Sequence, residues 1–285
     1  MCKEKLTKYD KLCDLHVHSH FSDGTLSPTE LVELAEASGL SSIALTDHNT
    51  IGGVPEVLSA AEGSAVKAIA GVELSTDYNG VELHVLALGF GCGAYGRINE
   101  LTEDYMKRKR LANKKLISDL IEAGYGISPE RIYEGAMGEV NRAHIAMELV
   151  RCGYVESRKE AFDDILASGG RFYTPPKRIS TPECIDFIAS IGARSVLAHP
   201  FLNIDEATLR GLLSEVGDRL DGMEVIYSEY DEETTALSYK IVEEYGLLPS
   251  GGSDFHGGNK PDISLGTGRG SLRIPLSFAE GLGLI

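Results

Sequence analysis

The sequence lacks the features that mark membrane, secreted or duplex-binding proteins. No run approaches the ~20 consecutive apolar residues that a membrane-spanning helix needs. The first residues, MCKEKLTKYDKLCD, contain no apolar segment of a secretion signal, so we expect a cytoplasmic protein. With 27 Lys and Arg against 43 Asp and Glu, the formal net charge is −16, which disfavours a broad basic surface for duplex DNA. We therefore expect neither a membrane nor duplex DNA among its partners.

Cysteine is also scarce. The five cysteines lie at positions 2, 13, 92, 152 and 184, and no two of them form a CxxC pair. An odd, scattered set argues against a disulfide framework and against a thiolate zinc site. We expect these residues to pack as small apolar side chains in or near the core. A chain of 285 residues, 42% of them hydrophobic, can bury a core without cross-links.

What the sequence does contain is an alternation of short apolar runs and helical patterns over residues 12–90. The helix predicted at residues 27–39 has clear end signals, because Ser27 suits the N-cap, Glu30 completes a capping box and Gly39 follows the last turn. This rhythm predicts parallel strands covered by helices. The predicted strands are CDLHVH, SSIALTDH, VKAIAGVELS and VELHVLALGF.

The pattern changes near residue 97. Residues 97–175 contain long, charged segments with helical period, such as INELTEDYMKRKRLANKKLISDLIEAG, and no convincing strand. From residue 176 the alternation resumes with the strand-like runs ARSVLAHP, DGMEVIY and LLPSGGSDFH. We therefore predict an α/β barrel formed by residues 1–96 and 176–285, interrupted by an all-helical insertion subdomain at 97–175.

Side chains that commonly bind metal ions fall at matching places in this pattern. A single strand-end histidine is usually a hydrogen-bonded or capping residue, and a single acidic residue there is usually a cap. Here, six separate segments supply such a residue, most of them at the C-terminal end of an apolar strand, where α/β barrels build active sites. Because so many polar groups would be costly to desolvate without partners, we expect them to bind metal ions. The nine candidates are His16, His18, Asp23, His48, Glu73, His84, His199, Asp254 and His256.

The type and number of these side chains constrain the metal. Imidazole and carboxylate ligands without thiolate suit Zn²⁺, Mn²⁺ or Fe²⁺. Nine ligands exceed what one tetrahedral zinc ion needs, so we expect two or three ions close together with a bridging carboxylate. Such a cluster would carry excess positive charge and would attract a phosphate group even in an acidic protein.

Six motifs occur in an order that is familiar from one family: HVHSHFSDG, TDH, GVE, LHVLALG, AHP and SDFHG. Over residues 12–90 and 176–266 the chain resembles the PHP (polymerase and histidinol phosphatase) phosphoesterases. The resemblance implies a distorted (β/α)7 barrel with three metal ions at the strand C-termini. His20 has no counterpart among the family's ligands, and Asn49 stands where many relatives carry an acidic residue.

The resemblance also implies how the nine residues divide among three ions. The first ion would be held by His16, His18, Glu73 and Asp254. Glu73 would bridge to a second ion, which His84 and His199 would also hold. The third would be held by Asp23, His48 and His256.

The helical insert resembles that of the branch that dephosphorylates nucleotides or trims RNA from its 5′ end. Relatives in this branch carry an Arg-x-His that reaches the substrate phosphate. Arg142 and His144 match it, although Ala143 replaces the usual proline. The alternative is an exposed helix start with Arg142 in a salt bridge. Tyr173 and Lys177, at the end of the insert, are further candidates for substrate binding.

The resemblance implies a metal-dependent phosphoric ester hydrolase that cleaves a phosphomonoester of a nucleotide, AMP-like or a 3′,5′-bisphosphate. Metal-activated hydroxide would attack phosphorus, and Arg142 and His144 would stabilise charge on the phosphoryl oxygens. Two alternatives stay open: a 5′→3′ exoribonuclease acting on short RNA, and a PHP module that binds metal without turnover. A histidinol-phosphate phosphatase is less favoured, because the helical insert is not typical of that branch.

Overall fold

The structure, a computed structural model, describes residues 11–136 and 140–285. The chain divides into two compact units. One, here called the barrel unit, comprises Met1–Asn99 and Ile179–Ile285, and the other, here called the insert, comprises Glu100–Arg178. The insert was predicted to span residues 97–175, whereas the compact unit in the structure spans Glu100–Arg178. Within the described part of the chain, no helix is both long enough and apolar enough to span a bilayer.

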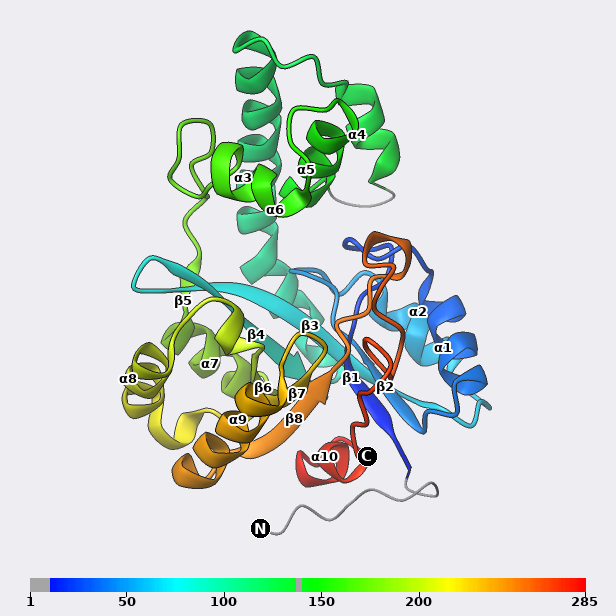
Figure 1. Cartoon of the computed structure of the whole chain (residues 1–285). Helices are drawn as coiled ribbons and strands as arrows, with labels where there is room; N and C mark the ends of the chain where they lie inside the picture. Colours follow the sequence, from blue (N-terminus) through cyan, green and yellow to red (C-terminus); the bar gives the residue numbers. More distant parts are fainter. Residues whose placement is uncertain (1–10, 137–139) are drawn as a thin grey trace. The chain divides into compact units, whose positions relative to one another are not determined.

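A single mixed sheet forms the centre of the barrel unit (Figure 1). Its strands follow the order β1-β2-β3-β4-β6-β7-β8, and the short β5 pairs with β3. The sheet nearly closes, because the N–H of Asp254 donates to His16 O (2.9 Å) and the N–H of His18 donates to Phe255 O (3.0 Å). The predicted fold class, a distorted barrel with a helical insert, is confirmed. The strands are β1 (Cys13–Val17), β2 (Ser42–Leu45), β3 (Lys67–Tyr78), β4 (Val81–Leu88), β5 (Ile179–Ser180), β6 (Arg194–Ala198), β7 (Gly222–Tyr227) and β8 (Leu248–Gly252).

Strand β4 differs from the prediction, because it runs antiparallel to both of its neighbours, β3 and β6. Asn79 and Gly80 have φ of 53° and 84° and join β3 directly to β4. A two-residue turn with positive φ at both positions makes a tight hairpin, whereas a parallel strand needs a long crossover. The start of β4 therefore lies beside the second half of β3, and His84 faces Ser75 across the ladder.

Helices pack around the sheet (Figure 1). The capping box predicted for α1 is present, since Ser27 and Glu30 each accept a backbone N–H from the other. Leu31 of α1 is fully buried against Ile43 of β2, and burial of a leucine side chain stabilises by about 1.5–3 kcal/mol. Helices α2, α8 and α10 were not predicted from the sequence. The helices are α1 (Pro28–Ala37), α2 (Val54–Ala60), α7 (Thr181–Ser190), α8 (Glu206–Val216), α9 (Glu232–Tyr245) and α10 (Ser277–Gly281).

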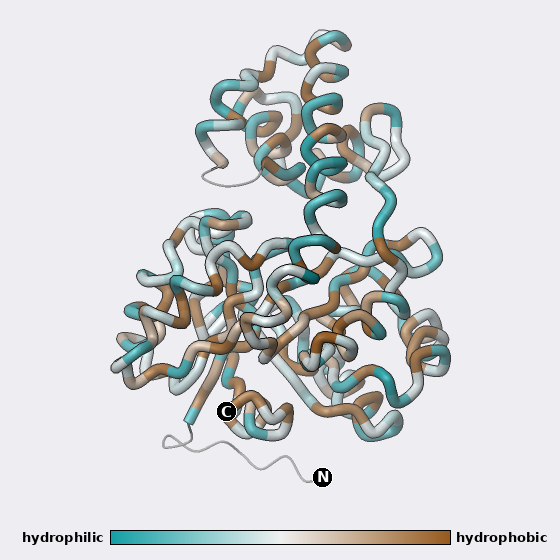
Figure 2. Tube along the Cα trace, turned by 180° about the vertical axis from the view of Figure 1, so that it is seen from behind, coloured by the Kyte–Doolittle hydropathy of each residue, from teal (hydrophilic) through white to brown (hydrophobic). Residues whose placement is uncertain are grey.

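Within the described residues of the insert, every regular element is helical, and turns and loops join these elements. Helix α3 begins in the barrel unit and continues into the insert, and hydrophobic and hydrophilic residues alternate along it (Figure 2). The insert has a core of its own, in which Leu116, Leu120, Ile145 and Leu149 are fully buried. Its elements are α3 (Tyr95–Glu122), α4 (Pro129–Gly135), α5 (Arg142–Arg151), α6 (Arg158–Glu160) and a π-helical turn (Ala161–Ile165).

The buried carboxylate of Glu148 links helices α4 and α5 of the insert. Glu148 accepts the backbone N–H of Ser128, the N-cap of α4, at 2.9 Å. Arg131 donates to the same carboxylate at 3.0 Å and Arg151 at 2.7 Å. The hydrogen bond from Arg151, aided by those from Arg131 and Ser128, outweighs burial and holds the pKa of Glu148 well below its usual range.

The cysteines follow the prediction only in part. Cys13 and Cys184 are buried, Cys152 is half-buried and Cys92 is exposed, and all four are free thiols. The expectation of a place in or near the core is wrong for Cys92, which lies in a short 3-10 turn (Cys92–Ala94) just before α3. Cys2 lies outside the described residues.

Candidate metal centre

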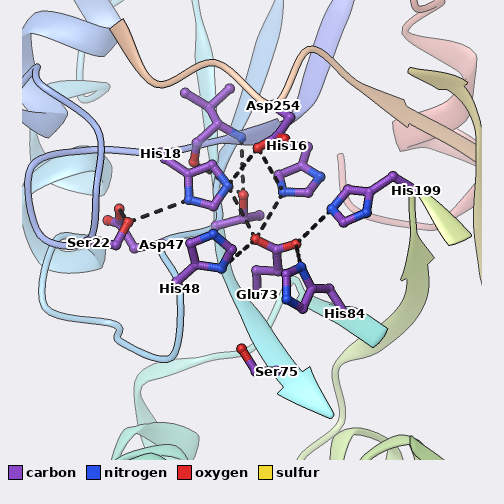
Figure 3. A network of polar contacts seen from close by, with 12 residues as sticks. His16, His18, Ser22, Asp47, His48, Glu73, Ser75, His84, His199 and Asp254 are labelled. Carbon is purple, nitrogen blue, oxygen red and sulfur yellow. Dashed lines mark hydrogen bonds and ion pairs between the residues drawn. The ribbon is translucent and has the colours of Figure 1, made fainter. Parts of the chain in front are cut away.

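Side chains from six strands or the loops after them meet at one end of the sheet (Figure 3). The structure brings together all nine residues that the sequence singled out. They form four overlapping groups, and the ligand atoms within each group lie within 4.8 Å of one another. His20 belongs to none of the groups, and its ring stacks on that of Phe21. The groups are His18, Asp23, His48 and His256; His16, His18 and Asp254; His16, Glu73 and His199; and His48, Glu73 and His84.

The strands explain this convergence. His16 lies in β1 and His18 just after it, so the alternation of side chains along a strand directs both to one face. Glu73 lies inside β3 and not at its end, because β3 continues to Tyr78. His84 reaches the same place from the start of β4, because that strand runs in the opposite direction.

The carboxylate of Glu73 lies at the centre of the cluster and is fully buried. Its Oε1 atom is 2.8 Å from Nδ1 of His84 and 3.1 Å from Nε2 of His199. Its Oε2 atom is 2.8 Å from Nδ1 of His48 and 3.3 Å from Nε2 of both His16 and His18. The two oxygens thus face different sets of histidines, which is the arrangement that a bridging carboxylate needs.

The backbone near the cluster adopts unusual conformations. His199, Asp254 and Asn49 have φ of 28°, 56° and 52°, a region that is costly for residues other than glycine. Hydrogen bonds hold each of them in place. Asn49 donates its N–H to Glu73 O (2.8 Å), and its side-chain amide exchanges two hydrogen bonds with Ser75 (2.9 and 3.0 Å). An asparagine at this position therefore still braces the strand that carries Glu73.

The buried carboxylates of the cluster favour the binding of positive charge. Burial alone would raise the pKa of Glu73, but His48 and His84 outweigh it and hold that pKa well below its usual range. Burial likewise opposes protonation of His84, yet Glu73 raises the pKa of His84 to about 10. Burial and the neighbouring His256 lower the pKa of His18 to about 3. The buried carboxylates therefore attract cations, while the crowded imidazoles cannot all be protonated.

Several buried atoms of the cluster make no hydrogen bond, and they are lone-pair donors of the kind that bind metal ions. Leaving such groups desolvated and unpaired is costly. Divalent ions would satisfy both these atoms and the need for positive charge, so the residues present fit a metal centre. The atoms are Nε2 of His16 and His18, Nδ1 of His48, His84 and His199, and Oε2 of Glu73.

Comparison with known proteins agrees with this geometry. The sequence pattern of the PHP domain matches residues 14–166. The chain belongs to the PHP domain family. A 5′-3′ exoribonuclease of Haemophilus influenzae is 35% identical over 256 residues, covering 86% of this chain and 90% of the relative. A 3′,5′-nucleoside bisphosphate phosphatase of Chromobacterium violaceum is 30% identical over 251 residues, covering 85% of this chain and 86% of the relative.

A solved structure shares the fold of this chain. A Bifidobacterium adolescentis protein assigned as a metal-dependent phosphoesterase superimposes with a TM-score of 0.81 at 27% identity, covering 95% of each chain. These relatives confirm the predicted class of the chain, a PHP phosphoric ester hydrolase.

The PHP centre is supported by buried polar residues that were not predicted from the sequence. Asp14 accepts the backbone N–H groups of Ser253 and Gly266 (2.9 and 2.8 Å), which positions the loop that carries Asp254. Asp14 lies inside an apolar strand, CDLHV. A carboxylate in such a place is a signal that could have revealed it, since a charged residue is rarely buried without partners.

Two further buried carboxylates had been overlooked. Asp47 accepts hydrogen bonds from the hydroxyls of Ser19 and Ser22, both at 2.6 Å, and so shapes the loop after β1. Glu224 of β7 contacts His16 and the backbone of His199. Asp47 had a weak sequence signal, because it lies within the motif TDH, whereas Glu224 lies alone in the apolar run GMEVIY.

The residues of the PHP insert that were predicted to bind substrate make contacts inside the insert. The guanidinium of Arg142 donates to Leu166 O (3.1 Å) and to Ser168 Oγ (3.0 Å) and stacks at 4.5 Å on the ring of Tyr173. His144 is buried, and its Nδ1 accepts the N–H of Asn141 in a capping box at the start of α5.

Tyr173 and Lys177 differ in exposure. Tyr173 belongs to the core of the insert, where it is 4% exposed, whereas Lys177 is exposed. Substrate binding by Arg142, His144, Tyr173 and Lys177 stays a prediction.

Proposed function

We propose that the chain is a metal-dependent phosphatase that hydrolyses a phosphomonoester of a nucleotide, either AMP-like or a 3′,5′-bisphosphate. The observation that carries the proposal is the position of Glu73, whose two oxygens face two sets of histidines, and several buried ring nitrogens of these histidines have no hydrogen-bond partner. The nucleoside bisphosphate phosphatase that is 30% identical to this chain supports the choice of substrate class.

The proposed centre holds two or three ions of Mn²⁺, Zn²⁺ or Fe²⁺, divided as the family resemblance implies. Three divalent ions carry about six positive charges, and Asp23, Glu73 and Asp254 cancel about three of them, so the centre keeps a net positive charge of about three. That charge favours a phosphate dianion. When bound, the ions supply Lewis acidity and activate water for attack on phosphorus.

The residues of the chain position these ions and the substrate. Asp254 illustrates how, because Tyr227 and Lys260 both donate to its Oδ2 atom. Its Oδ1 atom remains directed at His18 Nε2, 3.1 Å away, and at His16 Nε2, 3.6 Å away. Asp254 is therefore suited to bind one ion through a single oxygen. In the proposal, Arg142 and His144 contribute donors to the substrate phosphate, and Tyr173 and Lys177 also take part in substrate binding.

A phosphatase panel tests the proposal. The protein is loaded with Mn²⁺, and release of inorganic phosphate is measured from a 3′,5′-bisphosphonucleotide and from AMP. We expect phosphate release that is lost on chelation and in His18→Ala. A metal-replete enzyme that releases no phosphate from any nucleotide would contradict the proposal.

The second candidate function is 5′→3′ exoribonuclease activity, which the relative of 35% identity favours. The two reactions differ in their products. A 5′-phosphorylated oligoribonucleotide incubated with the loaded enzyme yields mononucleotides if the chain is an exoribonuclease, and an intact oligonucleotide with or without its terminal phosphate if it is not. Cytoplasmic location belongs to either proposal and stays a prediction.

A further inference from the structure

Each of the two carboxylate oxygens of Glu224 contacts a residue that is itself a candidate metal ligand. It lies in β7 and is fully buried. Its Oε1 atom is 2.9 Å from Nδ1 of His16. Its Oε2 atom accepts the backbone N–H of His199 at 2.7 Å. Glu224 belongs to none of the four groups of candidate ligands in the described residues, so its role is distinct from theirs.

The contact with His16 determines which nitrogen of that ring can bind a metal. A carboxylate oxygen accepts hydrogen bonds, so the neutral ring carries its proton on Nδ1 and leaves the lone pair on Nε2. The Nε2 atom has no hydrogen-bond partner and lies 3.3 Å from Oε2 of Glu73. A carboxylate behind a histidine in this way fixes the ring orientation and makes the ligand nitrogen more basic.

The contact with His199 restrains the backbone instead of the ring. His199 has φ of 28°, a conformation that a residue with a side chain adopts only when neighbouring groups enforce it. The hydrogen bond from its N–H to Glu224 supplies such a restraint. Its ring is thereby held with Nε2 3.1 Å from Oε1 of Glu73.

We propose that Glu224 is a positioning residue that simultaneously holds His16 and His199, from two other strands, in the geometry that metal binding requires. This inference rests on the proposed function, because the ions are the ones proposed there. The chemistry explains why a carboxylate stands at this position. Two N–H groups converge on it, and each needs an acceptor. Glutamine has almost the same shape but offers one acceptor oxygen, so Glu224→Gln can keep only one of the two hydrogen bonds.

The first experiment needs no metal. Ring nitrogens of the metal-free wild-type protein are observed by ¹⁵N NMR, and the signals of His16 are identified by their loss in His16→Gln. We expect a proton on Nδ1 of His16, because the neutral tautomer and the imidazolium that Glu224 can accept from both carry one there. A His16 ring without a proton on Nδ1 would overturn the inference, whatever the protein does with metals. This measurement does not depend on whether any Glu224 variant folds.

The second experiment titrates Mn²⁺ into metal-free wild type, Glu224→Gln and a matched control, Glu148→Gln. Glu148 is also a buried glutamate that accepts a backbone N–H, but it lies in the insert and outside the four ligand groups. We expect Mn²⁺ binding to weaken about 10- to 100-fold in Glu224→Gln, which is the usual effect of losing a residue that orients a ligand. Binding in Glu148→Gln should equal that of wild type.

The outcomes separate the two proposals. If wild type binds no Mn²⁺, the metal centre itself is wrong and the proposed function fails with it. If wild type binds Mn²⁺ and folded Glu224→Gln binds it equally well, the metal centre stands and the positioning role of Glu224 is refuted. Weakening of the same size in Glu148→Gln would also refute it, because the effect would then follow from loss of any buried carboxylate.

Discussion

The ammonium group of Lys260 lies 2.6 Å from Oδ2 of Asp254. Lys260 is partly exposed, whereas Asp254 is buried among the histidines of the centre. A fixed cation therefore stands beside a residue that is proposed to bind a metal ion. Asp254 partners this cation, and the additional positive charge beside the proposed centre accords with a phosphate substrate.

Replacing Lys260 by methionine tests its contribution to substrate binding. Lys260→Met removes the charge and keeps most of the side-chain volume. A hydrogen bond to a charged group contributes about 1.5 kcal/mol or more, so we expect KM for the nucleotide to rise about 10-fold while metal content stays the same. Steady-state kinetics and elemental analysis measure the two effects.

Tyr227→Phe is the control for Lys260→Met. The Tyr227 hydroxyl donates to the same oxygen of Asp254 at 2.8 Å, and its loss removes a hydrogen bond without removing charge. An equal rise of KM in both variants would show that Lys260 acts only through Asp254 and would contradict a charge effect on the substrate.

Glu73→Gln is predicted to disrupt the centre more than substitution of any residue that surrounds the centre. The variant keeps the shape of the residue but loses the charge that the histidines surround, and the amide leaves one acceptor oxygen where two are used. We expect loss of at least one bound ion per chain. We also expect kcat to fall by more than the ~10- to 100-fold that outer residues contribute. A variant with full metal content and unchanged kcat would remove Glu73 from the bridging role.

The insert is predicted to lose stability in acid through Glu148. Its carboxyl has a pKa below the usual range, chiefly because Arg151 donates a hydrogen bond to it. A carboxyl with a lowered pKa stabilises the fold above its unfolded pKa, roughly 4.3, and this stabilisation is lost as the pH falls towards the folded pKa. We therefore expect wild type to melt at a higher temperature than Glu148→Gln at pH 7, with the gap narrowing below about pH 4. A gap that is constant with pH would contradict this assignment.

Gly252 is predicted to be required at its position beside β1. A Cβ atom added there would lie 2.1 Å from Cβ of His16, so the two strands would have to separate. We expect Gly252→Ala to destabilise the fold by about 3 kcal/mol or more, the upper range for overpacking. Chemical denaturation measures the change. Gly93→Ala is the matched control, because nothing lies within 4 Å of a Cβ added there, and its effect should stay within about 0.5 kcal/mol.

Much of the barrel was predictable because its signals are local. Two histidines spaced two apart in an apolar run must share a face of a strand, so the spacing alone predicts that His16 and His18 point the same way. The end signals of α1 depend only on Ser27, Glu30 and their neighbours, and they were read correctly. The reversal of β4 was also signalled locally, by Asn79 and Gly80, but that signal was overlooked.

The sequence by itself determined which side chains could bind metal and that strands would carry them to one edge, because side-chain chemistry and strand period are written in neighbouring residues. Only the tertiary structure decided that Glu73 faces different histidines with each oxygen, and that Glu224 supports His16 from a strand 208 residues further along the chain. Hydrogen bonds of this kind depend on how distant strands pack, and no local pattern of residues specifies which buried donor will meet which acceptor.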